Sequence, residues 1–86
     1  MAGQVRLLLF AAAREAAGRG TDTFAIAEAT TLRALLDAAM SRYGDAFAEV
    51  LTTSRVWING DEPDGPSPML RDGDEVAVLP PVSGGA

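Results

Sequence analysis

The residues with the clearest chemical potential are the last seven, which read Pro-Pro-Val-Ser-Gly-Gly-Ala from Pro80 to Ala86. Proline lacks a backbone N–H and favours an extended path, so Pro80 and Pro81 would end a strand and direct the following residues into solvent. Gly84 and Gly85 have no Cβ and fit a channel that is too narrow for other residues. Such a segment offers a terminal carboxylate, which becomes an acyl donor once ATP converts it to an adenylate. The pattern predicts a tail that enters a partner protein.

The composition excludes most side-chain chemistry. The 86 residues suffice for one small domain, and the sequence contains no cysteine or histidine. We therefore expect no disulfide, no thiolate or imidazole catalysis and no Cys/His metal site. The net charge of -5 argues against nucleic acid and anionic membranes as partners and favours docking on a basic protein surface. The sequence shows neither a basic leader with an apolar core nor an apolar run of ~20 residues, so we expect a cytoplasmic protein that does not span a membrane.

The first third of the chain has strand and short-helix patterns. Residues 4–10 are rich in apolar residues on both alternating faces and predict a central strand. Residues 11–17 favour a short helical turn that Gly18 ends. After a turn at residues 20–22, a second strand at residues 23–28 would pair back on the first as a hairpin.

A long amphipathic helix is predicted next. Thr30 or Thr31 would cap its start, and Gly44 would end it. Its apolar residues recur at helical spacing, and they are Leu32, Leu35, Leu36, Ala39, Met40 and Tyr43. Residues 46–51 predict a further short, irregular helix.

The last third predicts two strands, at residues 55–59 and 75–79, joined by an acidic loop rich in proline and glycine. Two strands, a helix and two further strands are typical of an α+β protein with the β-grasp, ubiquitin-like fold, in which a mixed sheet packs on one main helix. We assign residues 1–81 to this domain and residues 82–86 to a flexible C-terminal tail.

A single main helix covers one face of the sheet and leaves the other open. If the neighbours of Trp57 in its strand face the helix, Trp57 faces away, and the same alternation turns Leu79 outward. With Leu8 and Phe10 of the first strand, these side chains would form an apolar patch at the root of the tail, which predicts a docking site. The alternative is that a loop or the short helix covers Trp57.

Three segments carry a resemblance to a known family. Residues 72–85 read Asp-Gly-Asp-Glu-Val-Ala-Val-Leu-Pro-Pro-Val-Ser-Gly-Gly, residues 5–18 contain Phe-Ala and Arg-Glu before a glycine, and residues 56–60 read Val-Trp-Ile-Asn-Gly. In these segments the chain resembles the small ubiquitin-like sulfur carriers, and most closely the small subunits of molybdopterin synthases. The resemblance covers nearly the whole chain.

The resemblance implies that Gly85 carries the chemistry. A ubiquitin-activating-type adenylyltransferase would use ATP to adenylate its carboxylate, and a sulfur donor protein would convert the adenylate to a thiocarboxylate. The tail would then enter the large catalytic subunit of molybdopterin synthase and donate sulfur to the pyranopterin precursor in molybdenum cofactor biosynthesis. This chain would bind no cofactor or metal and would supply no catalytic side chain.

The patch and the tail together give the predicted site. Gly84 would provide clearance beside the thiocarboxylate of Gly85, the prolines would aim the tail, and the two residues between prolines and glycines would contact the partner's channel. We therefore expect partner binding by Phe10, Trp57, Leu79, Pro80, Pro81, Val82 and Ser83.

Ala86 departs from the family pattern, in which the second glycine is the last residue. Its methyl group would obstruct a narrow channel. Three explanations are open: a protease removes Ala86, the residue is tolerated, or sulfur transfer has been lost. The intact tail before it favours removal or tolerance.

Two other functions are open. The same tail chemistry would serve a sulfur carrier for another pathway, such as the thiazole of thiamine or cysteine. From a different class, the chain would be a non-catalytic ubiquitin-like binding module or a protein modifier, with a C-terminus that is inert or conjugated to a lysine.

Acidic residues gather in the last third of the chain. The spacing of a Ca²⁺-binding loop is absent, so we interpret them as solvated turn residues that are able to meet basic groups on a partner. They are Asp61, Glu62, Asp64, Asp72, Asp74 and Glu75.

Overall fold

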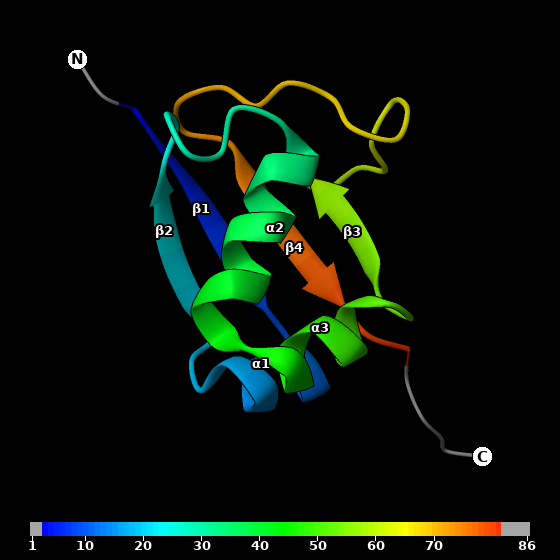
Figure 1. The fold of residues 1–86 in the computed structure, drawn as a ribbon. Coiled ribbons are helices and arrows are strands. Elements are labelled where there is room, and N and C mark those ends of the chain that lie inside the picture. Colours follow the sequence, from blue (N-terminus) through cyan, green and yellow to red (C-terminus); the bar gives the residue numbers. More distant parts are fainter. Residues whose placement is uncertain (1–2, 82–86) are drawn as a thin grey trace.

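The computed structural model describes residues 3–81 of the chain (Figure 1). Within this range the order of elements is β1 (Gln4–Leu9), α1 (Ala11–Ala17), β2 (Thr21–Ala25), α2 (Leu32–Tyr43), α3 (Asp45–Leu51), β3 (Arg55–Ile58) and β4 (Glu75–Leu79). No helix in this range has both the length and the apolar character needed to cross a membrane. The predicted tail residues Val82, Ser83, Gly84 and Gly85 lie outside the described residues.

The four strands form one mixed sheet in the order β2-β1-β4-β3. β1 pairs antiparallel with β2 and parallel with β4, and β3 pairs antiparallel with β4. α2 crosses one face of this sheet, with α1 and α3 near one end of it (Figure 1). The predicted α+β, β-grasp arrangement is confirmed, and α2 is the predicted main helix.

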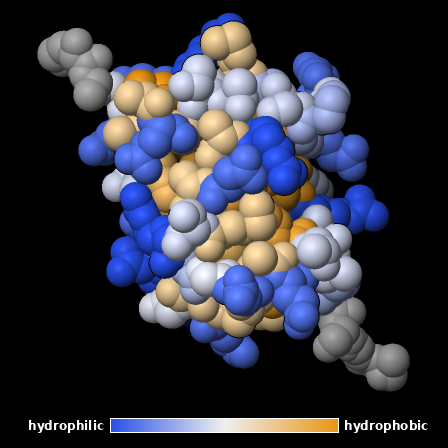
Figure 2. Space-filling view, in the orientation of Figure 1, coloured by the Kyte–Doolittle hydropathy of each residue, from blue (hydrophilic) through white to orange (hydrophobic). Residues whose placement is uncertain are grey.

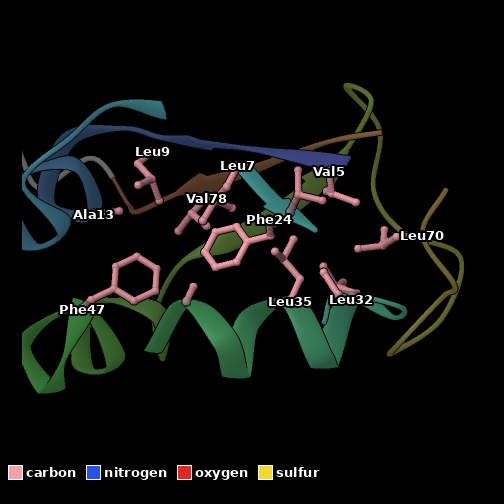
Figure 3. Packing of buried hydrophobic residues seen from close by; sticks show 13 residues of the cluster. Val5, Leu7, Leu9, Ala13, Phe24, Leu32, Leu35, Phe47, Leu70 and Val78 are labelled. Carbon is pink, nitrogen blue, oxygen red and sulfur yellow. The ribbon is translucent and has the colours of Figure 1, made fainter. Parts of the chain in front are cut away.

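The hydrophobic core lies between α2 and the inner face of the sheet (Figure 3). Thr31, one of the two predicted caps, precedes the first residue of α2, and its Oγ1 accepts a hydrogen bond from the backbone N–H of Ala34 at 3.1 Å. Leu35 of α2, Phe24 of β2 and Phe47 of α3 are all buried in this layer. α3 therefore belongs to the core and is a regular helix, where an irregular one was expected.

Three strand boundaries differ from those expected. β2 spans Thr21–Ala25 instead of residues 23–28, because its first residue already pairs with Leu8 of β1 and the chain turns after its last. β1 ends before Phe10, which becomes the N-cap of α1. β3 ends before Asn59, whose φ of 52° starts the turn that follows the strand.

The strand that leads to the tail ends at a corner of the sheet. Leu79, the last residue of β4, pairs with Arg55, the first residue of β3. The same end of the domain carries α1 and α3, whereas the loop between β3 and β4 lies at the other end (Figure 1). Half-buried Pro80 and exposed Pro81 continue the chain from this corner.

Candidate docking surface

Strand alternation separates two faces of the sheet. Val76 and Val78 of β4 are fully buried on the inner face. On the outer face, the register places Leu8 of β1, Ala77 of β4 and Trp57 of β3 in one row across the sheet. We call this outer apolar set the open face, and its members are Leu8, Phe10, Trp57, Ala77 and Leu79.

Two large apolar side chains of the open face are exposed to solvent. Phe10 is 45% exposed and Trp57 is 36% exposed, while Leu8 and Leu79 are half-buried. Trp57 is therefore partly packed, and part of its side chain is open to solvent. It is not covered by a loop or by the short helix, which was the alternative considered from the sequence. The fold brings the predicted residues Phe10, Trp57 and Leu79 to one face beside Pro80. Their contact with a partner stays a prediction.

A sharp backbone turn between β1 and α1 positions Phe10. Phe10 is extended, with φ of -122°, and Ala11 has φ of 50°, in the left-handed region that is unfavourable for a residue with a Cβ. This conformation costs on the order of 1–2 kcal/mol. The turn thus keeps Phe10 on the outer side while α1 packs inward.

The acidic turn before β4 holds in place the strand that leads to the tail. Asp72 Oδ1 accepts a hydrogen bond from Gln4 N at 2.8 Å. The Asp74 carboxylate accepts one from Arg71 N at 2.8 Å and one from Asn59 Nδ2 at 3.0 Å. These bonds tie the turn to the neighbouring segments of β1 and β3. Within residues 3–81, no group of three or more acidic side chains is arranged to hold a metal ion.

Asp22 links β2 to the end of α2. Its Oδ2 accepts hydrogen bonds from the Tyr43 hydroxyl at 2.6 Å and from Arg42 at 3.0 Å, and its Oδ1 accepts one from Thr23 N at 2.8 Å. Burial raises the pKa of Asp22, but these hydrogen bonds outweigh burial and leave the pKa below its ordinary value. Burial and the bond to Asp22 raise the pKa of Tyr43. Arg42 also lies over the ring of Phe24, 3.8 Å from its centroid.

Sequence reasoning missed this cluster. Its donor and acceptor residues are 20 and 21 positions apart, so no local pattern marks them as neighbours. The available signal was weak: an acidic residue at the start of a strand, and polar residues in the last turn of the long helix. The cluster stabilises the fold and lies outside the open face.

Charged side chains border the open face. Arg6 pairs with Glu75 at 3.4 Å, and Arg55 pairs with Glu62 at 3.7 Å. Exposed ion pairs add little to stability, but a polar rim around an apolar centre is typical of protein interfaces. On the helix-covered face, hydrophilic side chains are instead spread among the apolar ones (Figure 2). The described residues therefore form an apolar face with a charged border, and the expected acyl chemistry belongs to the tail.

A mixed four-stranded sheet on one main helix, with an open apolar face beside the C-terminal strand, defines a ubiquitin-like β-grasp domain. The model of the ThiS family matches residues 7–85, and the chain belongs to this family. The chain is similar to the molybdopterin synthase sulfur carrier subunits of Chlamydomonas reinhardtii, at 34% identity over 84 residues, and of Anopheles gambiae, at 37% over 86 residues. These matches cover 95% of this chain in both cases, and 99% and 92% of the respective relatives.

Solved structures share the fold. SAMP1 from Haloferax volcanii, a small archaeal modifier protein, matches with a TM-score of 0.82 and 30% identity over 96% of this chain and 100% of that chain. A chain in the complex of subunits 1 and 2 of the molybdopterin-converting factor from Helicobacter pylori matches with a TM-score of 0.70. The two sequences are 23% identical, and the match covers 95% of this chain and 99% of that chain. This similarity therefore shows a shared fold alone.

Proposed function

We propose that this protein is the sulfur-carrier small subunit of a molybdopterin synthase. The observation that carries the proposal is the similarity over 95% of the chain to two relatives that bear this name. The family match extends to residue 85 and so includes both glycines of the tail. The open face and the corner from which the tail departs supply a physical basis for docking.

Gly85 carries the transferred sulfur in this proposal. An adenylyltransferase of the ubiquitin-activating type joins the Gly85 carboxylate to AMP and releases pyrophosphate from ATP. A carboxylate is a poor electrophile, and the adenylate gives it a good leaving group. A sulfur donor protein then supplies sulfur at the oxidation level of sulfide, which forms a bond to the acyl carbon of Gly85, breaks its bond to AMP and leaves a thiocarboxylate with AMP as the leaving group. The large catalytic subunit receives the tail and transfers the sulfur to the pyranopterin precursor in the cytoplasm, and ATP is consumed by the activating partner alone.

The open face serves the docking steps. Phe10, Trp57 and Leu79 lie beside the tail root, so a partner that covers them also receives the tail. Aromatic side chains at the centre of an interface, surrounded by a polar rim, are enriched among the residues that contribute most of the binding energy. Because the carrier meets two proteins in turn, both would use this face with moderate affinity.

Ala86 is removed or tolerated in this proposal. Removal exposes the Gly85 carboxylate for adenylation. Variants that end at Gly85 and at Ala86, incubated with the adenylyltransferase and ATP, separate the two cases. Adenylation of the Gly85 form alone supports removal, and equal adenylation of both forms supports tolerance.

The experiment that tests the function is sulfur loading. The protein ending at Gly85 is incubated with ATP, the adenylyltransferase and a sulfur donor, and its intact mass is measured. Replacement of one oxygen by sulfur is expected, followed by loss of that sulfur when the large subunit and the pyranopterin precursor are added. Absence of the mass gain would contradict the proposal.

A second candidate function is protein modification, which the likeness to SAMP1 at a TM-score of 0.82 favours. In that case the activated Gly85 would form an amide with a lysine of a target protein. A sulfur carrier for the thiazole of thiamine or for cysteine is the alternative within the same class. Sulfur loading without transfer to the pyranopterin precursor would favour another carrier pathway, and covalent adducts with other proteins would favour a modifier.

A further inference from the structure

An open hollow of about 450 Å³ adjoins the open face. It lies between the end of β1, the first turns of α1 and the start of β2, and its lining includes Leu8 and Phe10 of the open face together with Thr21. Arg14 of α1 contributes the one charged side chain to this lining within the described residues. The hollow thus connects the apolar surface of the open face with the positively charged side chain of Arg14.

Arg14 is exposed and lies beside Gly20. A Cβ built on Gly20 would lie 3.5 Å from Arg14 Nε, so the guanidinium stem lies along the bare backbone of Gly20. Glu15 follows it in α1 and lines the neighbouring hollow, but within residues 3–81 it forms no ion pair with Arg14.

Arg14 also differs from most other arginines of the chain. Within residues 3–81, five of the seven arginines pair with a carboxylate, and Arg14 and Arg71 do not. Arg71 lies in the turn before β4, and the start of β4 lies at the end of the domain opposite α1 (Figure 1). Arg14 is therefore the unpaired arginine that adjoins the open face.

We propose that Arg14 binds a carboxylate of the large catalytic subunit when that subunit docks on the open face. The inference rests on the proposed function. The planar guanidinium suits a carboxylate because it donates two parallel hydrogen bonds. Phe10, in the same lining, would shield the pair from water when the partner covers it, which strengthens the interaction.

The test compares Arg14→Gln with Arg71→Gln in the full-length protein. Both changes remove one positive charge, so effects of net charge cancel in the comparison. Binding of the large subunit is measured by calorimetry at two salt concentrations. Loss of an interfacial charge pair is expected to raise Kd about 10-fold or more for Arg14→Gln, against less than about 2-fold for Arg71→Gln. Arg14→Lys keeps the charge without the bidentate geometry and should lie between Arg14→Gln and the wild type.

A direct readout accompanies the affinities. The Nε–Hε resonance of Arg14, followed by NMR, should shift when the large subunit is added, and the backbone spectrum of Arg14→Gln should otherwise match the wild type. Equal affinities of the two glutamine variants, or an unmoved Arg14 resonance in a formed complex, would overturn the inference while leaving the proposed function intact. A wild-type protein that does not bind the large subunit would overturn both.

Discussion

Replacing Trp57 by alanine should weaken docking far more than removal of an exposed side chain elsewhere. A tryptophan side chain presents on the order of 250 Å² when fully accessible. Trp57 is 36% exposed, which leaves about 90 Å² for a partner to cover. At about 25 cal/mol per Å², this area is worth about 2 kcal/mol on docking, or roughly 40-fold in Kd.

The matched control is Met69→Ala. Met69 is 72% exposed but lies in the loop before β4, outside the open face. Kd for the large subunit is measured by calorimetry for both variants, and urea unfolding of each variant separates lost binding from lost stability. A Trp57→Ala protein that is folded and binds within twofold of Met69→Ala would refute the assignment of the open face as the docking surface.

Two further predictions concern stability. The pKa of Asp22 is lowered in the folded state, so its contribution is present above the unfolded pKa of about 3.9 and is lost as the pH falls through the lower folded value. Urea unfolding of wild type and Asp22→Asn should therefore differ at pH 7, the difference should shrink as the pH falls below about 3.9, and a difference independent of pH would contradict this. Ala11→Gly removes the Cβ from a residue at φ of 50° and should stabilise the protein by about 1 kcal/mol, seen as a higher Tm. A lower Tm would show that the turn is not strained.

Local patterns predicted the elements that depend on nearby residues. The apolar spacing and the Thr31 cap gave α2, and the alternation from Glu75 to Leu79 before two prolines gave β4. The bounds of β2 were wrong because pairing of Thr21 with Leu8 in β1 sets its start, and that pairing is not visible in the segment itself.

For the candidate docking surface, too, local patterns predicted one part and tertiary contacts determined the other. The outward direction of Trp57 and Leu79 follows from alternation, but the exposed fraction of Trp57 depends on packing that only the folded chain reveals. The hollow beside Phe10 could not be predicted, because Arg14 and Gly20 come together through the turn between α1 and β2. Contacts between segments that are distant in the sequence determine the shape and exposure of this surface.

The central claim is that the terminal carboxylate of the tail, on Gly85 or on a tolerated Ala86, becomes a thiocarboxylate. The most direct measurement is the intact mass of the protein purified from its native cells, with fragmentation of its C-terminal peptide. The proposal predicts a population in which the peptide ends at Gly84-Gly85, or at Ala86 if that residue is tolerated, with sulfur in place of one terminal oxygen. A C-terminus found only as an ordinary carboxylate, or only in amide linkage to other proteins, would contradict it.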